Sequence, residues 1–272
     1  MKVNIGIHGG TIQWDGIYYF GLSDYPNISN WELKKLIFLD EYEKSYGREI
    51  QIDCDNKDIL EIVNKALIYP ENYRKVQPPD KITECTACKY KCCLTDYVCH
   101  TASVESAKSI ILSGKLLSAV KAFNKTAFEL VHDPRNAAGD TPDYFDYIMF
   151  NWGNCQAGDN LVMERMLNKS PEKQDLSVNF RPGVRFYFKY NDLITHPLFV
   201  FDGYHTVKIQ DELLISDYLF VCIIPENCKS EFENIVPDSI KDRVFYIKND
   251  CKDIWDWSEK VYDFVVKHSH SL

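Results

Sequence analysis

Apolar and polar positions in the first seventy residues follow a β-rich pattern and then a helical one. Short runs of β-branched and aromatic residues predict strands at 3–7, 11–14 and 17–20. Asp15-Gly16 separates the last two runs, and an Asp-Gly pair in such a place is typical of a hairpin turn. We therefore expect a strand followed by a β-hairpin.

Two helices are predicted next. Ser29-Asn30-Trp31-Glu32 has the sequence of a capping box, so a helix should start there and end near Gly47. A second helix is expected over Lys57–Tyr69, ended by Pro70. The predicted buried face of this second helix carries Ile59, Ile62, Val63 and Ala66.

Residues 70–84 are polar and contain Pro70, Pro78 and Pro79, a composition typical of a linker. We therefore predict two parts. An N-terminal αβ module covers residues 1–80, and a larger body with a Cys-rich entry segment covers residues 81–272.

In the body, strands are expected in the middle and helices around them. Ser103-Val104-Glu105-Ser106 should cap a helix that ends at Gly114. Further helices are predicted near Lys229 and at the end of the chain, where the apolar face carries Ile254, Trp257, Val261, Phe264 and Val265. The predicted strands are 97–101, 147–150, 184–190, 213–215, 218–224 and 243–247. This arrangement favours the α+β class.

Composition narrows the class of protein. The 272 residues are 45% hydrophobic and 26% charged, as in ordinary globular domains. No apolar run approaches the roughly 20 residues that span a bilayer, so we expect a cytoplasmic protein without a membrane partner. The net charge of -9 argues against broad binding to phosphate backbones but leaves room for a local basic groove.

Five of the ten cysteines fall within residues 85–99. In a reducing compartment a disulfide framework is not expected there. Three interpretations stay open: a structural zinc site, free thiols, or a redox or iron–sulfur role. The zinc ligands would be Cys85, Cys88, Cys92 and either Cys93 or Cys99, with Cys99 preferred.

Two short segments are candidates for chemistry. His100-Thr101 ends a predicted strand just before a helix N-terminus, where backbone donors and the helix dipole favour anions. Gln210-Asp211-Glu212 precedes a predicted strand and could direct a carboxylate into a pocket. Each has a plainer interpretation. His100 could be a structural histidine, and Glu212 could be a solvated glutamate in a turn. The sequence has no phosphate-binding loop ending in Gly-Lys-Ser/Thr, no His-Glu-x-x-His and no Gly-x-Ser-x-Gly.

Residues 97–248 resemble the ADP-ribosyltransferase superfamily, and within it the DarT-type DNA ADP-ribosyltransferases. The resemblance is carried by His100-Thr101 with the helix after it, by the aromatic segment 144–150, and by Glu212-Leu213-Leu214-Ile215. It implies the split β-sheet core of that superfamily and NAD as the substrate. Asn151-Trp152-Gly153 stands where that subgroup often has an Asn-Pro-Met-like segment.

The resemblance also implies a role for each matching residue. Glu212 would stabilise the oxocarbenium-like charge, and His100 and Thr101 would hold the NAD ribose. The remaining matches are Arg135 as the family's arginine, Gln210 of a Gln-x-Glu turn, and Tyr144 or Tyr147 stacking on nicotinamide. The acceptor stays open between a DNA or RNA base, a protein side chain and water, the last making a NAD glycohydrolase. A non-catalytic zinc-stapled module that binds a nucleotide or a protein is the other alternative.

Overall fold

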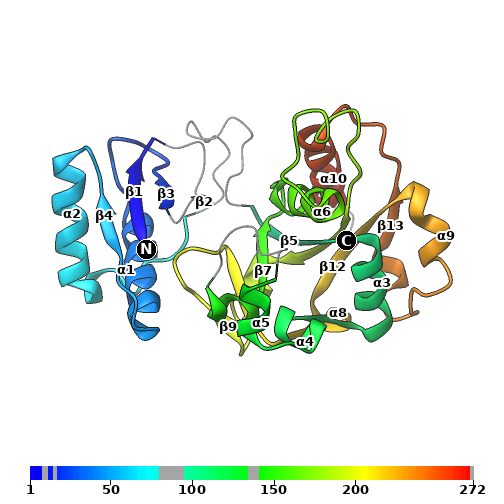
Figure 1. Cartoon of the computed structure of the whole chain (residues 1–272), viewed down its shortest axis with the longest axis horizontal. Helices are drawn as coiled ribbons and strands as arrows, with labels where there is room; N and C mark the ends of the chain where they lie inside the picture. Colours follow the sequence, from blue (N-terminus) through cyan, green and yellow to red (C-terminus); the bar gives the residue numbers. More distant parts are fainter. Residues whose placement is uncertain (8–11, 15–16, 80–94, 134–140, 270–272) are drawn as a thin grey trace. The chain divides into compact units, whose positions relative to one another are not determined.

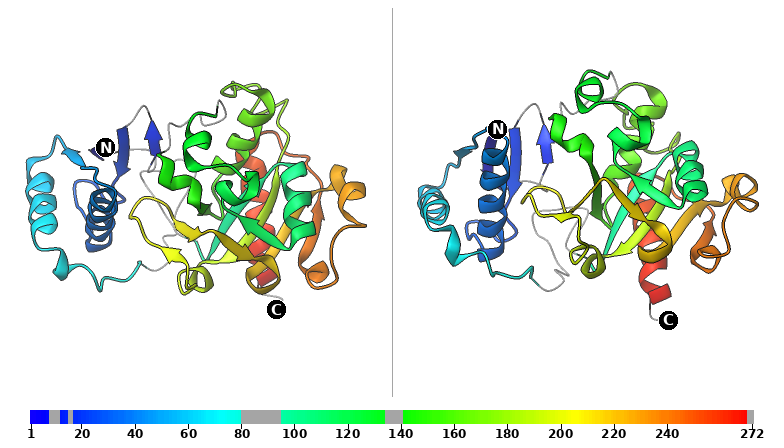
Figure 2. Two further views of the ribbon diagram at one scale, coloured as in Figure 1. Left: turned by 60° about the horizontal axis from the view of Figure 1, so that its bottom comes forward. Right: turned by 90° about the horizontal axis from the view of Figure 1, so that it is seen from below.

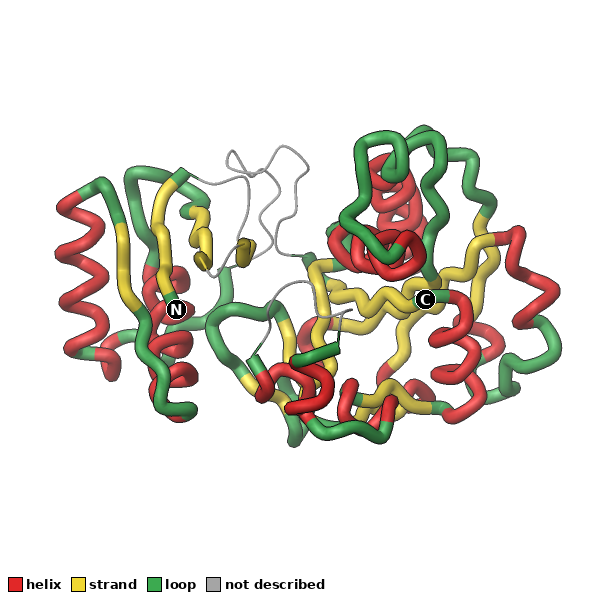
Figure 3. The backbone as a smooth tube through the Cα atoms, viewed as in Figure 1, coloured by secondary structure: helices red, strands yellow, loops and turns green. Residues whose placement is uncertain are grey.

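The computed structural model describes residues 1–7, 12–14, 17–79, 95–133 and 141–269 (Figure 1). The chain divides into two compact units. Unit 1 comprises residues 1–94, 136–140 and 201–206, and unit 2 comprises residues 95–135, 141–200 and 207–272. In both units helices pack beside strands (Figure 3), so the α+β class is confirmed.

Unit 1 contains a four-stranded sheet with the order β2-β3-β1-β4. Strand β1 pairs in parallel with both β3 and β4, whereas β2 is antiparallel to β3. The β2–β3 pairing confirms the predicted hairpin. The strands span Lys2–Gly6 (β1), Ile12–Trp14 (β2), Ile17–Gly21 (β3) and Gln51–Asp53 (β4).

Helices α1 (Asn30–Ser45) and α2 (Lys57–Ile68) complete unit 1. The capping box at Ser29 is confirmed, and Gly47 after α1 adopts the left-handed φ of +69° that favours glycine. The prediction for the face of α2 is wrong at one position. Ile62 is 44% exposed, while Ile59, Val63 and Ala66 are buried. The buried face of α2 is therefore narrower than the face that its apolar residues predict.

Residues 201–206 are distant in sequence from the rest of unit 1 but pack on α1. Phe201 stacks on Trp31 with ring centroids 5.5 Å apart. Gly203 has φ +71°, and a Cβ atom there would overlap the backbone of Lys35. Buried Asp202 accepts hydrogen bonds from the backbone N–H groups of Tyr204 and His205. Only a glycine at 203 permits this close approach to the helix.

The main sheet of unit 2 has the strand order β13-β12-β8-β5-β7-β10-β9. All neighbours are antiparallel except β12 and β13. Its strands are β5 (Tyr97–Ala102), β7 (Tyr147–Trp152), β8 (Val184–Lys189), β9 (Phe199–Val200), β10 (Val207–Gln210), β12 (Leu219–Pro225) and β13 (Val244–Ile247). Two further strands, β6 (Lys115–Leu117) and β11 (Glu212–Leu214), pair with each other.

Both faces of this sheet are buried. Alternate residues of β8 point to opposite sides, so Phe186 and Phe188 join one apolar cluster and Tyr187 joins another. Helix α10, the red helix of Figure 2, lies against the sheet. Its Trp257 and Val261 belong to the second cluster. The helices of unit 2 are α3 (Val104–Ser113), α4 (Ala119–Phe123), α5 (Ala127–Val131), α6 (Ala157–Leu167), α7 (Tyr190–Leu193), α8 (Ile215–Tyr218), α9 (Lys229–Phe232) and α10 (Ile254–Ser269).

Two details refine the sequence prediction. The strand predicted over residues 147–150 is confirmed as β7, whereas the first part of the aromatic segment 144–150 is not strand, because Pro142–Asp146 forms a 3₁₀ turn that contains Tyr144. Proline fixes φ and has no N–H, which suits the first position of such a turn. The helix expected near Lys229 is a single α-helical turn. None of the described helices is long and apolar enough to cross a membrane.

Candidate functional site

His100 lies on β5, between β8 and β7 in the main sheet. Its Nδ1 is 3.2 Å from the carbonyl oxygen of Met149 on β7. Because a carbonyl only accepts hydrogen bonds, we assign the proton to Nδ1, which leaves Nε2 as an acceptor. Burial lowers the pKa of His100, so the ring is neutral at pH 7. A neutral, oriented imidazole with an acceptor nitrogen suits a ligand hydroxyl.

Thr101 is held between two glycine backbones. A Cβ atom at Gly158, in the first turn of α6, would overlap Thr101 Oγ1. A Cβ atom at Gly183, just before β8, would come within 2.8 Å of Thr101 Cγ2. Both glycines are therefore needed for the close approach of α6 and β8 to this threonine, which fixes its position.

A fully buried ion pair lies beside Thr101. Arg185, opposite Thr101 in the β5–β8 register, donates from Nε to Asp159 Oδ2 at 2.7 Å. Its other nitrogens donate to Ser258 Oγ at 3.0 Å and to Tyr187 OH at 3.2 Å. Asp159 Oδ1 accepts from the backbone N–H of Gly183 at 2.8 Å. The network joins β8, α6 and α10.

This network was not predicted from the sequence. Its one visible signal is an arginine inside the apolar run Val184–Phe188, because a charged residue within a buried strand must find a partner. Nothing in the sequence points to Asp159 or Ser258, which are 26 and 73 residues away from Arg185.

Glu212 is the first residue of β11. Its Oε1 accepts from Lys115 Nζ at 3.0 Å, and the side chain is 38% exposed. The hydrogen bond from Lys115 lowers the pKa of Glu212, so the carboxylate is ionised at neutral pH. The side chain is both charged and accessible, as an electrostatic role requires.

Asp211 separates Gln210 from Glu212 and has a left-handed φ of +65°. Its N–H donates to the carbonyl of Asp146 at 3.0 Å, and its own carbonyl accepts from Ser118 N at 2.7 Å. Gln210 is exposed and ends β10 opposite Tyr147. The strained residue thus directs the chain from the main sheet into the β6–β11 pair, and the two predicted residues fall on different sheets.

Tyr144 and Tyr147 surround a lysine that the sequence analysis did not single out. Lys208 on β10 is fully buried, and its ammonium lies 4.7 Å from the Tyr144 ring centroid and 4.1 Å from that of Tyr147. Such contacts stabilise a desolvated cation. Tyr144 is itself buried, whereas Tyr147 is half-buried. Tyr147 is therefore the more accessible ring for stacking.

The sheet register connects these groups through β7. His100 contacts the carbonyl of Met149, Met149 lies opposite Lys208, and Tyr147 lies opposite Gln210. His100 and Gln210 are thus on strands separated only by β7, whereas Glu212 lies on β11 in the other sheet, and no hydrogen bond between described side chains joins it to His100.

Of the remaining predicted residues, the structure describes only Cys99. Arg135, Cys85, Cys88, Cys92 and Cys93 lie outside the described residues. Cys99 is buried in β5 with Sγ 3.8 Å from Thr101 Oγ1, and burial raises its pKa to about 12. Among the described residues no group of three or more His, Cys, Asp or Glu side chains could hold a metal ion. The zinc site stays a prediction.

Comparison with known proteins gives no match, whether with family models, curated proteins or solved structures.

Proposed function

We propose that the protein is an NAD-dependent ADP-ribosyltransferase that modifies a macromolecule, either a DNA or RNA base or a protein side chain. The observation that carries the proposal is the state of His100, a neutral imidazole whose Nδ1 is held by Met149 O while Nε2 can accept. We also propose that unit 2 has the split β-sheet core of that superfamily.

The proposed reaction breaks the bond between nicotinamide and the ribose C1′. Nicotinamide leaves with the bonding electron pair, and positive charge spreads over C1′ and the ring oxygen. Glu212, ionised beside Lys115, would accept a hydrogen bond from the 2′-hydroxyl and stabilise this charge, as carboxylates do in glycoside chemistry. The acceptor nucleophile then bonds to C1′ and loses its proton.

The other side chains would bind and orient the substrate. His100 Nε2 would accept from a ribose hydroxyl, and Thr101, fixed by Gly158 and Gly183, would contact the same ribose. Tyr147 would stack on the nicotinamide ring. Arg135 and Gln210 keep the roles that the family resemblance implies.

The decisive experiment measures nicotinamide release from labelled NAD in the presence of cell extract. Glu212→Gln should lower the rate about 100-fold or more, the size typical for loss of transition-state charge stabilisation. Glu226→Gln, the same change at an exposed glutamate of unit 2, should leave the rate unchanged. Label recovered on a macromolecule supports the transferase, whereas free ADP-ribose alone identifies a glycohydrolase. Absence of nicotinamide release with every extract would refute both.

A further inference from the structure

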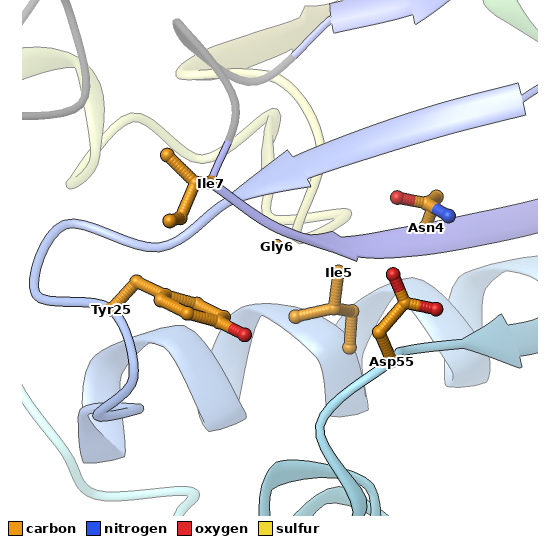
Figure 4. A pocket seen from close by; sticks show the side chains of 6 residues that line it. All are labelled: Asn4, Ile5, Gly6, Ile7, Tyr25 and Asp55. Atoms are coloured by element: carbon orange, nitrogen blue, oxygen red, sulfur yellow. The ribbon is translucent and has the colours of Figure 1, made fainter.

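Unit 1 contains a pocket at the carboxyl end of its parallel strands. It has a volume of about 270 Å³ and is lined by Asn4, Ile5, Gly6, Ile7, Tyr25 and Asp55 (Figure 4). Asn4 to Gly6 end β1, and Asp55 follows the neighbouring parallel strand β4. In open sheets with parallel strands, ligands bind outside the carboxyl ends of the strands. The pocket belongs to a different unit from His100 and Glu212.

Asp55 is the charged group of this pocket. The nearby Asp53 is engaged by Lys2 at 3.0 Å and by Asn4 Nδ2 at 3.2 Å. Asp55 is exposed and makes no ion pair with any described residue. It stands between β4 and Asn56, whose side chain caps α2 by accepting from two backbone N–H groups. The backbone of Asp55 is therefore held between β4 and the cap of α2, and its carboxylate is available to a ligand.

The rest of the lining decides what kind of ligand fits. None of the described lining residues is a cation, so a phosphate or carboxylate would be repelled by Asp55. Tyr25 is 37% exposed, and Figure 4 shows its hydroxyl directed toward Ile5, beside which the Asp55 carboxylate lies. The Asn4 amide lies on the other face of β1 from Ile5 and donates to Asp53. The carboxylate and the phenol beside the apolar Ile5 suit a small ligand with several hydroxyl donors.

We propose that this pocket binds the ribose of a nucleoside. The vicinal hydroxyls would both donate to the Asp55 carboxylate, and the base would lie on the Tyr25 ring. A carboxylate that follows the strand next to β1 is also where dinucleotide-binding sheets recognise a ribose. At about 270 Å³ the pocket is slightly below the common range of about 300–1,000 Å³ for ligand sites, which favours a nucleoside over a dinucleotide. The site is independent of the proposed transferase activity.

The test is a titration of the full chain with adenosine, in which binding is monitored by ligand-observed NMR. Asp55→Asn should weaken binding roughly tenfold, the effect of losing a charge-assisted hydrogen bond. Asp58→Asn, the same change in the first turn of α2 outside the pocket lining, should have no effect. 2′-Deoxyadenosine should bind the wild type about as weakly as adenosine binds Asp55→Asn.

Three outcomes would overturn the inference: no saturable binding of adenosine, equal affinity in Asp55→Asn and the wild type, or equal affinity for 2′-deoxyadenosine. Ethylammonium binding that requires Asp55, without adenosine binding, would identify a cation site instead. Glu212→Gln separates this site from the proposed active site, because that change should lower nicotinamide release about 100-fold or more but keep adenosine binding. Asp55→Asn should weaken adenosine binding but keep nicotinamide release.

Discussion

Arg185 and Asp159 form a buried ion pair that links strand β8 to helix α6, with neither side chain exposed to solvent. Each guanidinium nitrogen of the arginine has a partner, since Asp159, Tyr187 and Ser258 all accept from it. Burial of two charges is costly, and only such complete compensation makes it stable. Arg185 lies opposite Thr101 in the β5–β8 register.

Asp159→Ala should lower the free energy of unfolding by about 3–5 kcal/mol, because it leaves the Arg185 charge buried without its counter-ion. The change is measured by urea unfolding of the full chain, monitored by tryptophan fluorescence. Glu172→Ala, which breaks the exposed pair with Lys169, should change stability little. Equal effects of the two substitutions would contradict the role given to the network.

Gly158 tests the packing around Thr101. An alanine in a helix normally gains up to about 1 kcal/mol over glycine. Here the added Cβ would overlap Thr101 Oγ1, and overpacking costs about 1–3 kcal/mol, so Gly158→Ala should destabilise the protein. Removing the hydroxyl with Thr101→Ala should recover part of the loss in the double variant. Strictly additive losses in urea unfolding would show that the two residues do not compete for space.

His100 should make stability depend on pH. Its folded pKa lies below the ordinary value of 6.5, so the unfolded chain binds the extra proton more readily. The stability contributed by the neutral ring is present above pH 6.5 and is lost as the pH falls through the window down to the folded pKa. His100→Gln should therefore show a shallower decline in that window. His132→Gln, at an exposed histidine, should keep the slope of the wild type; a parallel decline for His100→Gln would be evidence against a neutral ring.

Zinc content tests the cysteine cluster of residues 85–99. A site built from Cys85, Cys88, Cys92 and Cys99 should hold about one zinc per chain after anaerobic purification. Less than about half an equivalent by elemental analysis would count against the site. Cys228→Ser, at a cysteine of η3 (Glu226–Cys228) far from the cluster in sequence, should not change the metal content.

Local signals predicted much of the secondary structure. Ser29 with Glu32 starts α1, Ser103 caps α3, and Gly114 ends α3 with φ +72°. Each signal acts within four residues, so the backbone groups that it satisfies are already adjacent in the sequence. The same locality explains why β7 begins at Tyr147. Aromatic residues extend back to Tyr144, but the turn at Pro142 has its own hydrogen bond from Tyr144 N to Thr141 O.

Two residues of the candidate site were predicted from the sequence, and their roles stay predictions. His100 and Glu212 could be singled out from their places beside predicted strands, and the structure adds the protonation state of each through Met149 and Lys115. Lys208 between two tyrosines was not anticipated, although a lysine within the run Val207–Ile209 is visible in the sequence. Whether such a lysine faces solvent or the interior depends on which strand pairs beside it.

By itself the sequence determined the class of the fold, most helix and strand positions, and two segments suited to chemistry. Tertiary structure alone decided that Arg185 meets Asp159, that residues 201–206 pack on α1, and that Asp55 lies beside the end of β1. The reason is physical. Caps and turns are satisfied within a few residues, whereas buried charges and pockets depend on contacts between segments that only strand order and register bring together.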